Sequence, residues 1–349
     1  MPQPQKVFFD ANVLIQEGKP PGSPLVLRIA DLVKAGLIEV VTTDLTLSEV
    51  AKKHAENDYE VIKETGRSHF RKLVSQHIGA VLPEMSKSEL KIRISNRFTK
   101  SVDSMFKGLK AKILPIDAVK PSTVFSAYSS GLGFFSADSK KDQFPDAFIF
   151  ECLKACASAE SPLIIVSNDG DFEAPVKSEK HISLLKTITS LFESLNLKVE
   201  APNVQEFLKN QQSTLIDLCD EELNDWGLQV SDVEDAEIDA TTVTNVELND
   251  VISFGSITTA GSILVVGAAE IRATVFYTHP NWDEALYDSE DGVLIPFDDV
   301  SGETEVTVNP DFSMYIEVDA NGTPVSITEL QFSSSDFIFV ELNGYDADR

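Results

Sequence analysis

The sequence predicts an α/β fold, in which a parallel sheet is flanked by helices, followed by a mostly antiparallel β domain. Two observations support this order. Between residues 6 and 199, short apolar or β-branched runs alternate with segments whose apolar residues recur at helical spacing, which is typical of strands joined by crossover helices. After residue 226, the pattern changes to short alternating segments separated by turn residues, which indicates antiparallel strands.

The charge of the chain changes near the same place. Residues 1–212 contain 27 Lys and Arg against 26 Asp and Glu, whereas residues 213–349 contain 2 against 30, a net charge of −28. Because an abrupt change in charge is typical of a domain boundary, we expect domains at residues 1–212 and 213–349. So acidic a surface repels nucleic acid, which excludes the second domain as a platform for it.

The composition predicts an intracellular, cytoplasmic protein. No apolar run approaches the roughly 20 residues of a membrane helix, so we expect no membrane contact. The start, MPQPQKVFFD, lacks the basic-then-apolar order of a secretory signal. Cys152, Cys156 and Cys219 are odd in number and have no histidines nearby, so we expect buried thiols and neither zinc nor a disulfide.

In the first domain, a strand from residue 6 ends at Asp10 and opens onto a loop. A helix over residues 25–37 leads into a strand over 38–43, and a capped helix follows over 44–54. Residues 55–112 continue as two or more helices with an excess of basic residues. The remaining predicted elements are a strand over 112–116, a loop over 121–142, a helix over 144–159, a buried parallel strand over 163–166, a helix over 182–195 and a short strand over 197–199.

The second domain follows a helical connector over residues 204–226. Its predicted strands cover residues 263–266, 271–277, 305–308, 313–318 and 337–342. Asn321 with Gly322, and Gly302, are expected to supply turns between them. We therefore expect a sandwich or a curled sheet.

Several acidic residues follow the predicted parallel strands. In such a sheet the ligand site lies outside the carboxyl ends of the strands. Asp10 follows the first strand, and Asp169 and Asp171 follow the strand over 163–166. Glu49 lies one turn into the helix after the second strand, and Asp146 opens the helix FPDAFIFECL. We expect four carboxylates, with either Asp169 or Asp171 as the fourth, to meet in one pocket.

Such a pocket predicts a divalent metal site. Neighbouring carboxylates repel one another unless a cation lies between them, and hard oxygen ligands select Mg²⁺ or Mn²⁺. An ion bound in this way generates hydroxide and stabilises the charge of phosphodiester displacement. The sequence offers no Ser-His-Asp set, no Gly-rich phosphate loop and no HExxH spacing among its five histidines.

The segments VFFDANVLI, LTLSEV, FPDAFIFECL and IIVSNDGDF carry a resemblance in their order and spacing. Over Lys6 to Glu200, the chain resembles the PIN domain family of metal-dependent ribonucleases. It is similar to the larger PIN variants, because residues 55–112 and 121–142 exceed the minimal domain.

The resemblance implies endonucleolytic cleavage of single-stranded or structured RNA, with acids that hold one or two divalent ions. It gives Asp10, Glu49, Asp146 and Asp169 catalytic and metal-binding roles, with Asp171 as a further ligand. The supporting residues are Asn12, which would orient Asp10 or a metal-bound water, and Asp142, which would lie beyond the direct ligands. Pairing of two copies is common among the relatives it implies.

The basic helices are a candidate surface for RNA phosphates. Its members are Lys52, Lys53, Arg67, Arg71, Lys91, Arg93 and Arg97. The alternative is an ordinary solvated helix face, because Glu56, Glu60, Glu64 and Glu89 are interspersed.

Other functions compete with an endoribonuclease. A flap-type DNA nuclease shares the acidic site, and a catalytically idle PIN scaffold would keep the acids as a regulatory ion site. Taken singly, each acid also has a structural interpretation, such as an Asx-turn at Asp10 or a favoured helix N-terminus at Asp146. Three interpretations are open for the acidic domain. It docks on the basic helices of the same chain, it binds a basic partner protein, or it is simply a soluble module.

Overall fold

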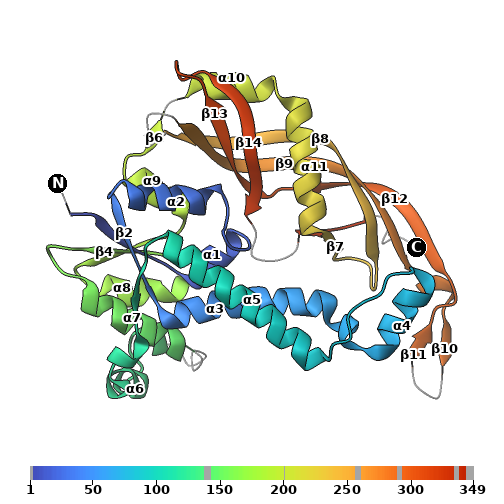
Figure 1. Ribbon diagram of the computed structural model, residues 1–349, viewed down its shortest axis with the longest axis horizontal. Coiled ribbons are helices and arrows are strands. Elements are labelled where there is room, and N and C mark those ends of the chain that lie inside the picture. Colours follow the sequence, from blue (N-terminus) through green and yellow to red (C-terminus); the bar gives the residue numbers. More distant parts are fainter. Residues whose placement is uncertain are drawn as a thin grey trace. The chain divides into compact units, whose positions relative to one another are not determined.

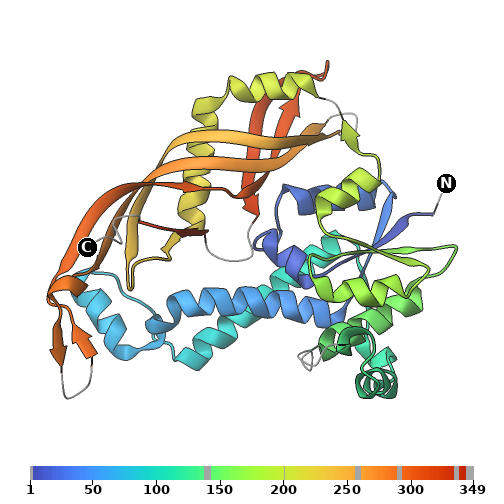
Figure 2. The same cartoon turned by 180° about the vertical axis from the view of Figure 1, so that it is seen from behind.

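The chain divides into two units, Met1–Leu195 and Asn196–Arg349 (Figures 1 and 2). This computed structural model describes residues 3–136, 143–199, 201–255, 261–288, 293–333 and 338–342. The division falls at 195/196, whereas the charge pattern places it at 212/213. The reason is that the helices on both sides of residue 212 pack into the core of the C-terminal unit, so charge and packing change at different points.

Five parallel strands form the sheet of the N-terminal unit. They are β1 (Gln5–Phe9), β2 (Ile38–Thr43), β3 (Lys112–Leu114), β4 (Leu163–Val166) and β5 (Ile182–Leu185), in the order β3-β2-β1-β4-β5. The order changes direction between β1 and β4, and a crevice forms at such a point outside the carboxyl ends of the strands. The topology therefore directs attention to the residues that follow β1 and β4.

Helices flank this sheet, as the sequence predicts (Figure 1). They are α1 (Ala11–Gln16), α2 (Pro24–Lys34), α3 (Asp44–Ile62), α4 (Ser68–His77), α5 (Lys87–Gly108), α6 (Pro121–Ser129), α7 (Phe144–Cys156), α8 (Glu173–Lys177) and α9 (Ile188–Ser194). Short 3₁₀ turns occur at η1 (Lys63–Gly66), η2 (Ile116–Ala118), η3 (Gly133–Phe135) and η4 (Gly170–Phe172). The core includes Phe8, Ile165 and Leu153, each fully buried. Apolar burial of this kind stabilises the sheet against α7.

The helices α3 and α5 pack against each other over a long contact. Thr43 begins α3, because its hydroxyl accepts a hydrogen bond from the backbone N–H of Thr46 at 3.1 Å. Ser86 and Glu89 form a reciprocal capping box at the start of α5. Between the two helices, α4 has no buried residue. The basic helical region of the sequence is therefore a helical pair with an exposed connecting helix.

Three details of the N-terminal unit differ from the predictions. Residues 121–136 are not a loop, because they form α6 and η3, whose Val124, Phe134 and Phe135 pack against the core. The segment predicted as one helix over 182–195 is β5 followed by α9, with Thr187 as the cap. The loop after Asp10 is the short helix α1. In each case the element is too short to show a clear period.

The C-terminal unit contains an antiparallel sheet built on β9 (Ser262–Pro280). Along one edge β9 pairs with β8 (Glu237–Phe254), and along the other with β13 (Asp311–Val318) and β12 (Asp299–Val308). The strand β14 (Pro324–Ser333) pairs with β13, and β6 (Lys198–Val199) pairs with β8. Two separate pairs are β10 (Leu286–Asp288) with β11 (Val293–Ile295), and β7 (Leu228–Val230) in parallel with β15 (Ile338–Val340).

The mostly antiparallel prediction is confirmed, but the sequence did not predict β8 and β14. In β8, only a minority of the side chains are buried, among them Val243, Val246 and Phe254, so alternation is weak. Gly302 lies within β12 and not in a turn. A Cβ atom there would lie 2.6 Å from the hydroxyl oxygen of Tyr277, so glycine makes room for that ring.

The helices α10 (Pro202–Lys209) and α11 (Gln212–Trp226) belong to this second unit, with η5 (Trp282–Glu284) at a strand end. Acidic side chains of α11 accept hydrogen bonds from backbone N–H groups of the sheet. Asp220 accepts from the N–H of Val243 at 2.7 Å, and Glu222 accepts from the N–H of Phe332 at 3.0 Å. Burial raises the pKa of Glu222, and the hydrogen bonds oppose that rise. Some of the negative charge in this unit is therefore structural.

We predict that the fragment 196–349 unfolds at higher urea concentration than the fragment 213–349. The shorter fragment lacks Val204 and Leu208, which are buried in the core. Loss of two such side chains costs roughly 3–6 kcal/mol of unfolding free energy. Circular dichroism during urea titration measures the difference, and equal midpoints would show that α10 is dispensable.

Candidate active site

Asp10 is buried at the carboxyl end of β1, with an exposed fraction of 4%. Its backbone N–H donates to the carbonyl of Val166 at the end of β4, at 3.0 Å. Its Oδ1 accepts from the N–H of Ala11 at 2.8 Å, and its Oδ2 accepts from the hydroxyl of Ser167 at 2.7 Å. The carboxylate is therefore fixed between the two strands that meet at the change of strand order.

Ser167 also connects Asp10 to the second acidic loop. Its hydroxyl oxygen accepts from the N–H of Asp169 at 3.1 Å. Asp169 in turn caps η4, because its Oδ1 accepts from the N–H of Asp171 at 2.8 Å. Sequence analysis missed Ser167, although its position directly after β4 was the available signal. One buried hydroxyl thus sets the separation of two acidic loops.

Glu49 and Asp146 come from helices on the same part of the sheet. Glu49 lies on α3 and Asp146 in the first turn of α7, and these helices contact each other. Glu49 is exposed and Asp146 is half-buried. Both carboxyl groups therefore lie where solvent or an ion can reach them.

The four acids interact electrostatically. The pKa of Asp146 is raised to about 7, mainly by desolvation and then by the negative charges of Asp10, Glu49 and Asp169, in that order of effect. Desolvation and Asp10 also raise the pKa of Glu49. Although Glu49 is exposed as a residue, its carboxyl group has enough protein around it to lose part of its hydration. The structure thus brings all four predicted acids into one electrostatic group.

Burial likewise raises the pKa of Asp10. The hydrogen bonds from Ser167 and Ala11 oppose that rise, and the charge of Asp169 adds to it. Among the described residues, none of these four carboxylates forms an ion pair, and the charge of Lys52 acts on Glu49 alone, whose pKa it lowers. Four like charges at one sheet edge are unfavourable, and a positive ion between them would relieve the repulsion.

The acids are not arranged as a finished metal cage. Among the described residues, no group of three or more His, Cys, Asp or Glu side chains is arranged so that it could hold a metal ion. The donor chemistry nevertheless fits a hard divalent cation, because all donors are carboxylate oxygens. Each oxygen of Asp10 accepts one hydrogen bond and retains a lone pair. The side chains would have to rearrange to bring these oxygens together around one ion.

The supporting residues have varied positions. Asn12 is exposed in the first turn of α1, and Asp171 lies in η4 beside Asp169. Asp142 lies outside the described residues, so its predicted role stays a prediction. Asp169 lies three positions after the end of β4. It interacts electrostatically with both Asp10 and Asp146. These interactions connect the loop after β4 to the site.

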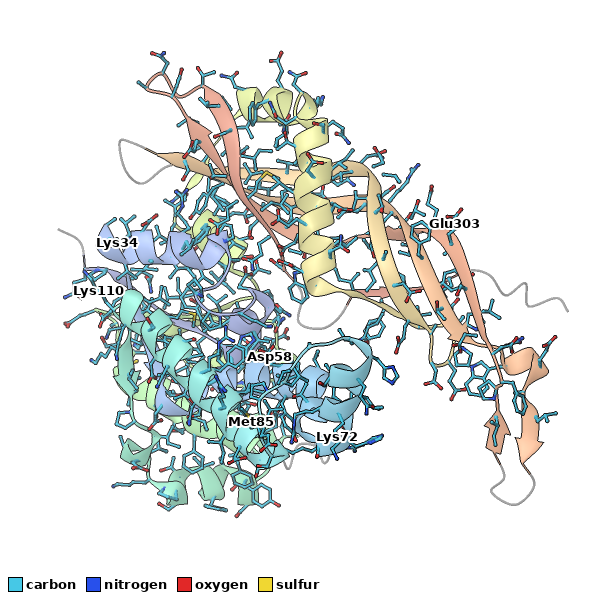
Figure 3. The ribbon with its side chains drawn as sticks, turned by 45° about the vertical axis from the view of Figure 1, so that its right-hand side comes forward. Lys34, Asp58, Lys72, Met85, Lys110 and Glu303 are labelled. Carbon is cyan, nitrogen blue, oxygen red and sulfur yellow. The ribbon has the colours of Figure 1, made fainter. Side chains whose placement is uncertain are left out.

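The basic residues do not form one uniform patch. Arg71 is half-buried and donates from Nη1 to the carbonyls of Thr65 and Met85, both at 3.0 Å, so it holds the connection between helices together. Arg67 pairs with Glu64 at 2.9 Å. Lys53, Arg93 and Arg97 are exposed, as is Lys72 on α4 (Figure 3).

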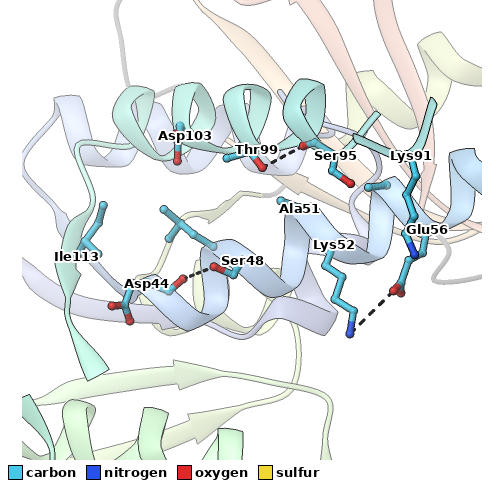
Figure 4. Close-up of a pocket in the computed structure, with 12 residues that line it drawn as sticks. Asp44, Ser48, Ala51, Lys52, Glu56, Lys91, Ser95, Thr99, Asp103 and Ile113 are labelled. Carbon is cyan, nitrogen blue, oxygen red and sulfur yellow. Dashed lines mark hydrogen bonds and ion pairs between the residues drawn. The ribbon is translucent and has the colours of Figure 1, made fainter. Parts of the chain in front are cut away.

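Lys52 and Lys91 line a groove of about 530 Å³ between α3 and α5 (Figure 4). Lys52 lies 3.9 Å from Glu56, and Lys91 lies over the ring of Tyr59. The groove also contains Asp44 and Asp103, so its charge is mixed. It lies along α3, the helix that carries Glu49.

Fold and site together define an α/β unit with an acidic centre at the carboxyl edge of its parallel sheet. Comparison with protein families narrows this class further: the family model described as PIN domain matches residues 7–172. This match is consistent with a PIN domain in the N-terminal region of the chain. PIN domains are typically nucleases that act on phosphodiesters and generally use divalent metals, so the region has a nuclease-type fold with nucleic acid as the implied substrate. No curated protein and no solved structure matches the chain.

The described helices were also compared with the requirements of a membrane span. Within the ranges that the structure covers, no helix combines the length and apolar character needed to cross a bilayer.

We predict that Asp146→Asn stabilises the metal-free protein near neutral pH. The folded pKa of Asp146 is about 7, against an ordinary value of 3.8, so folding retains a proton that unfolding releases. The unfolding free energy of the parent therefore falls as pH rises from about 4 to 7. The variant lacks this loss, so its advantage over the parent should grow by about 2 kcal/mol between pH 5 and pH 7.

Urea unfolding in a chelator at pH 5 and pH 7 measures this advantage. Glu160→Gln serves as the control, because Glu160 is exposed in the connection that precedes β4, at the opposite end of that strand. An advantage that does not change with pH would contradict the electrostatic grouping of the acids.

Proposed function

We propose that the N-terminal unit is a Mg²⁺- or Mn²⁺-dependent endoribonuclease. The observation that carries this proposal is a group of interacting carboxylates at the change of strand order, where burial first, and neighbouring negative charges second, raise the pKa values of Asp10, Glu49 and Asp146. Asp10, Glu49, Asp146 and Asp169 would hold the cation. The PIN family provides the general nuclease chemistry, and the choice of RNA and of these residues is our inference.

Each side chain has a definable task in this proposal. A bound divalent ion supplies Lewis acidity for attack on the phosphodiester. Asp10 is preorganised by Ser167 and by the N–H of Ala11, which fix both of its oxygens. Glu49 and Asp146 supply charge from the helix side, and Asp169 supplies it from the β4 loop. Asn12, exposed on the same α1 turn, would orient a nearby water or the carboxylate.

Substrate contact would involve the exposed cations of α3 and α5. Lys52, Lys53 and Lys91 lie on these helices, and Arg93 and Arg97 lie on α5. Lysine and arginine side chains bind phosphates without regard to sequence. Arg71 is excluded from this set, because its guanidinium is used to hold Thr65 and Met85.

We predict that Asp10→Asn and Asp146→Asn each lower cleavage at least 100-fold without unfolding the protein. Each substitution removes a negative charge while it keeps the shape of the side chain nearly unchanged. Labelled single-stranded RNA incubated with the protein and Mn²⁺ measures cleavage, with Glu160→Gln as the active control. A variant that cuts at the parent rate would refute the assignment of that residue.

The same assay distinguishes the two other functions. Preferential cleavage of branched DNA would indicate a flap-type nuclease. Absence of cleavage together with Mn²⁺-dependent stabilisation would indicate an idle scaffold with a regulatory ion site. The scaffold is favoured by one observation, namely that the described acids do not form a finished metal cage.

The acidic C-terminal unit is proposed to regulate or to bind, either through intramolecular docking on the basic helices or through a basic protein partner. Its net charge of −28 over residues 213–349 supports attraction to a cationic surface. We also propose a cytoplasmic location and pairing into a homodimer. Docking, partner binding, location and pairing are all independent of the assignment of the active site.

For intramolecular docking, we predict that the fragment 1–195 cleaves RNA several-fold faster than the full chain at low salt. The difference should shrink as salt rises, because screening weakens attraction between charged surfaces. Initial rates over a salt series measure it, with circular dichroism to verify that the fragment is folded. Identical rates and salt dependence for both proteins would refute restraint by the acidic unit.

A further inference from the structure

The strand β8 has an edge that is only partly covered. On one side it pairs with β9 through most of its length, whereas on the other it pairs with β6 only at Ser253 and Phe254. Next to that short pairing, residues 246–251 line a groove of about 510 Å³. The opposite wall consists of Gln205, Leu208, Lys209, Gln212 and Leu215 from α10 and α11.

The backbone of Leu248 points into this open side. Leu248 lies opposite Ala269 in β9, and the N–H of Ala269 donates away from β8 to the carbonyl of Pro310 at 2.9 Å. In an antiparallel pair the two opposed residues both face inward or both face outward. The N–H and C=O of Leu248 therefore face away from β9, and within the described residues no hydrogen bond satisfies them.

Val246 confirms this alternation two residues earlier. Its carbonyl accepts a hydrogen bond from Nε2 of Gln212 on α11 at 2.8 Å, on the side away from β9. A side chain thus satisfies the edge at Val246, while the next outward-facing residue, Leu248, has no equivalent. The unsatisfied edge is therefore local and borders the groove.

A β-bulge keeps this segment apart from the β6 pairing. The register shifts between Asn249 and Ile252, and Asp250 has a φ of 51°. Gly267 permits the close approach, because a Cβ atom there would lie 2.7 Å from the carbonyl oxygen of Asn249. Bulges of this kind bend a strand and end its regular pairing. The edge at Leu248 is consequently separate from the β6 pairing.

Charge identifies the kind of strand that fits. Glu247 and Asp250 are exposed in the groove wall, and Lys209 is the one cation that lines it among the described residues. A second copy of this chain would bring the same acidic edge, which like-charge repulsion opposes. An extended segment with alternating basic residues gains both backbone hydrogen bonds and charge attraction.

We infer that the β8 edge binds a short, extended, basic peptide segment of another protein, which adds to the sheet as a strand. Backbone groups of the segment would pair with Leu248, and its Lys or Arg side chains would lie beside Glu247 and Asp250. Affinity would come from the backbone and selectivity from charge. This inference rests on the basic-partner role proposed for the C-terminal unit and gives that role a site, and it does not depend on the nuclease proposal.

A labelled peptide of alternating Lys and Val tests the inference with the full chain. Anisotropy should show binding that is lost when Glu replaces Lys in the peptide. Successive residues of a strand present their N–H groups to opposite edges. Methylation of the peptide's backbone nitrogens in one alternate set should therefore weaken binding at least tenfold, and in the other set less than twofold. Equal weakening by both sets, or no binding of the unmodified peptide, would overturn the inference.

Protein variants locate the site independently. Asp250→Asn should weaken binding about threefold, because asparagine retains the left-handed backbone conformation while it loses the charge. Glu303→Gln is the matched control. Glu303 is exposed on β12 (Figure 3), and its substitution removes the same charge from the same unit. Peptide addition should also slow hydrogen exchange at the Leu248 amide. Equal effects of the two variants, with unchanged exchange at Leu248, would place the peptide elsewhere and refute the site.

Discussion

The electrostatic repulsion among Asp10, Glu49, Asp146 and Asp169 is the constraint on which the N-terminal unit depends. A fold that gathers four carboxylates at one sheet edge gives up stability there, and the loss has to be offset by burial elsewhere. Phe8, Leu153 and Ile165, all fully buried, belong to the core that provides this offset. Strain of this type is expected where an ion is to be bound, because the ion converts repulsion into attraction.

The two units use acidic residues for opposite purposes. In the N-terminal unit, burial and neighbouring negative charges raise the pKa values of Asp10, Glu49 and Asp146. In the C-terminal unit Asp220 and Glu222 face backbone N–H groups of β8 and β14, and so replace strand pairing with side-chain hydrogen bonds. Leu248 lies on the same edge as the Asp220 contact, but no such acceptor or donor meets it within the described part of the chain. The edge is thus protected at some positions and open at another.

Sequence patterns predicted the parallel strands and the acids that follow them, because β1 and β4 are continuous apolar runs that end abruptly at polar residues. These patterns did not predict elements whose structure depends on packing against the rest of the unit and not on the periodicity of the local sequence. The α6 segment is rich in serine and has few apolar positions, and β8 buries only a minority of its side chains, so neither shows strong alternation. Ser167 could not be recognised, since its importance lies in a hydrogen bond to Asp10 across 157 positions of sequence. Residue charge likewise could not reveal that α10, which precedes residue 212, packs with the second unit.

A crystal structure of the protein soaked with Mn²⁺, with anomalous scattering used to locate the ion, tests the central claim most directly. The account predicts a manganese ion coordinated by Asp10 and by at least one helix acid, Glu49 or Asp146, at roughly 2.0–2.3 Å, the usual range for divalent cations with oxygen ligands. An ion bound elsewhere, or carboxylates that remain apart at saturating Mn²⁺, would contradict it.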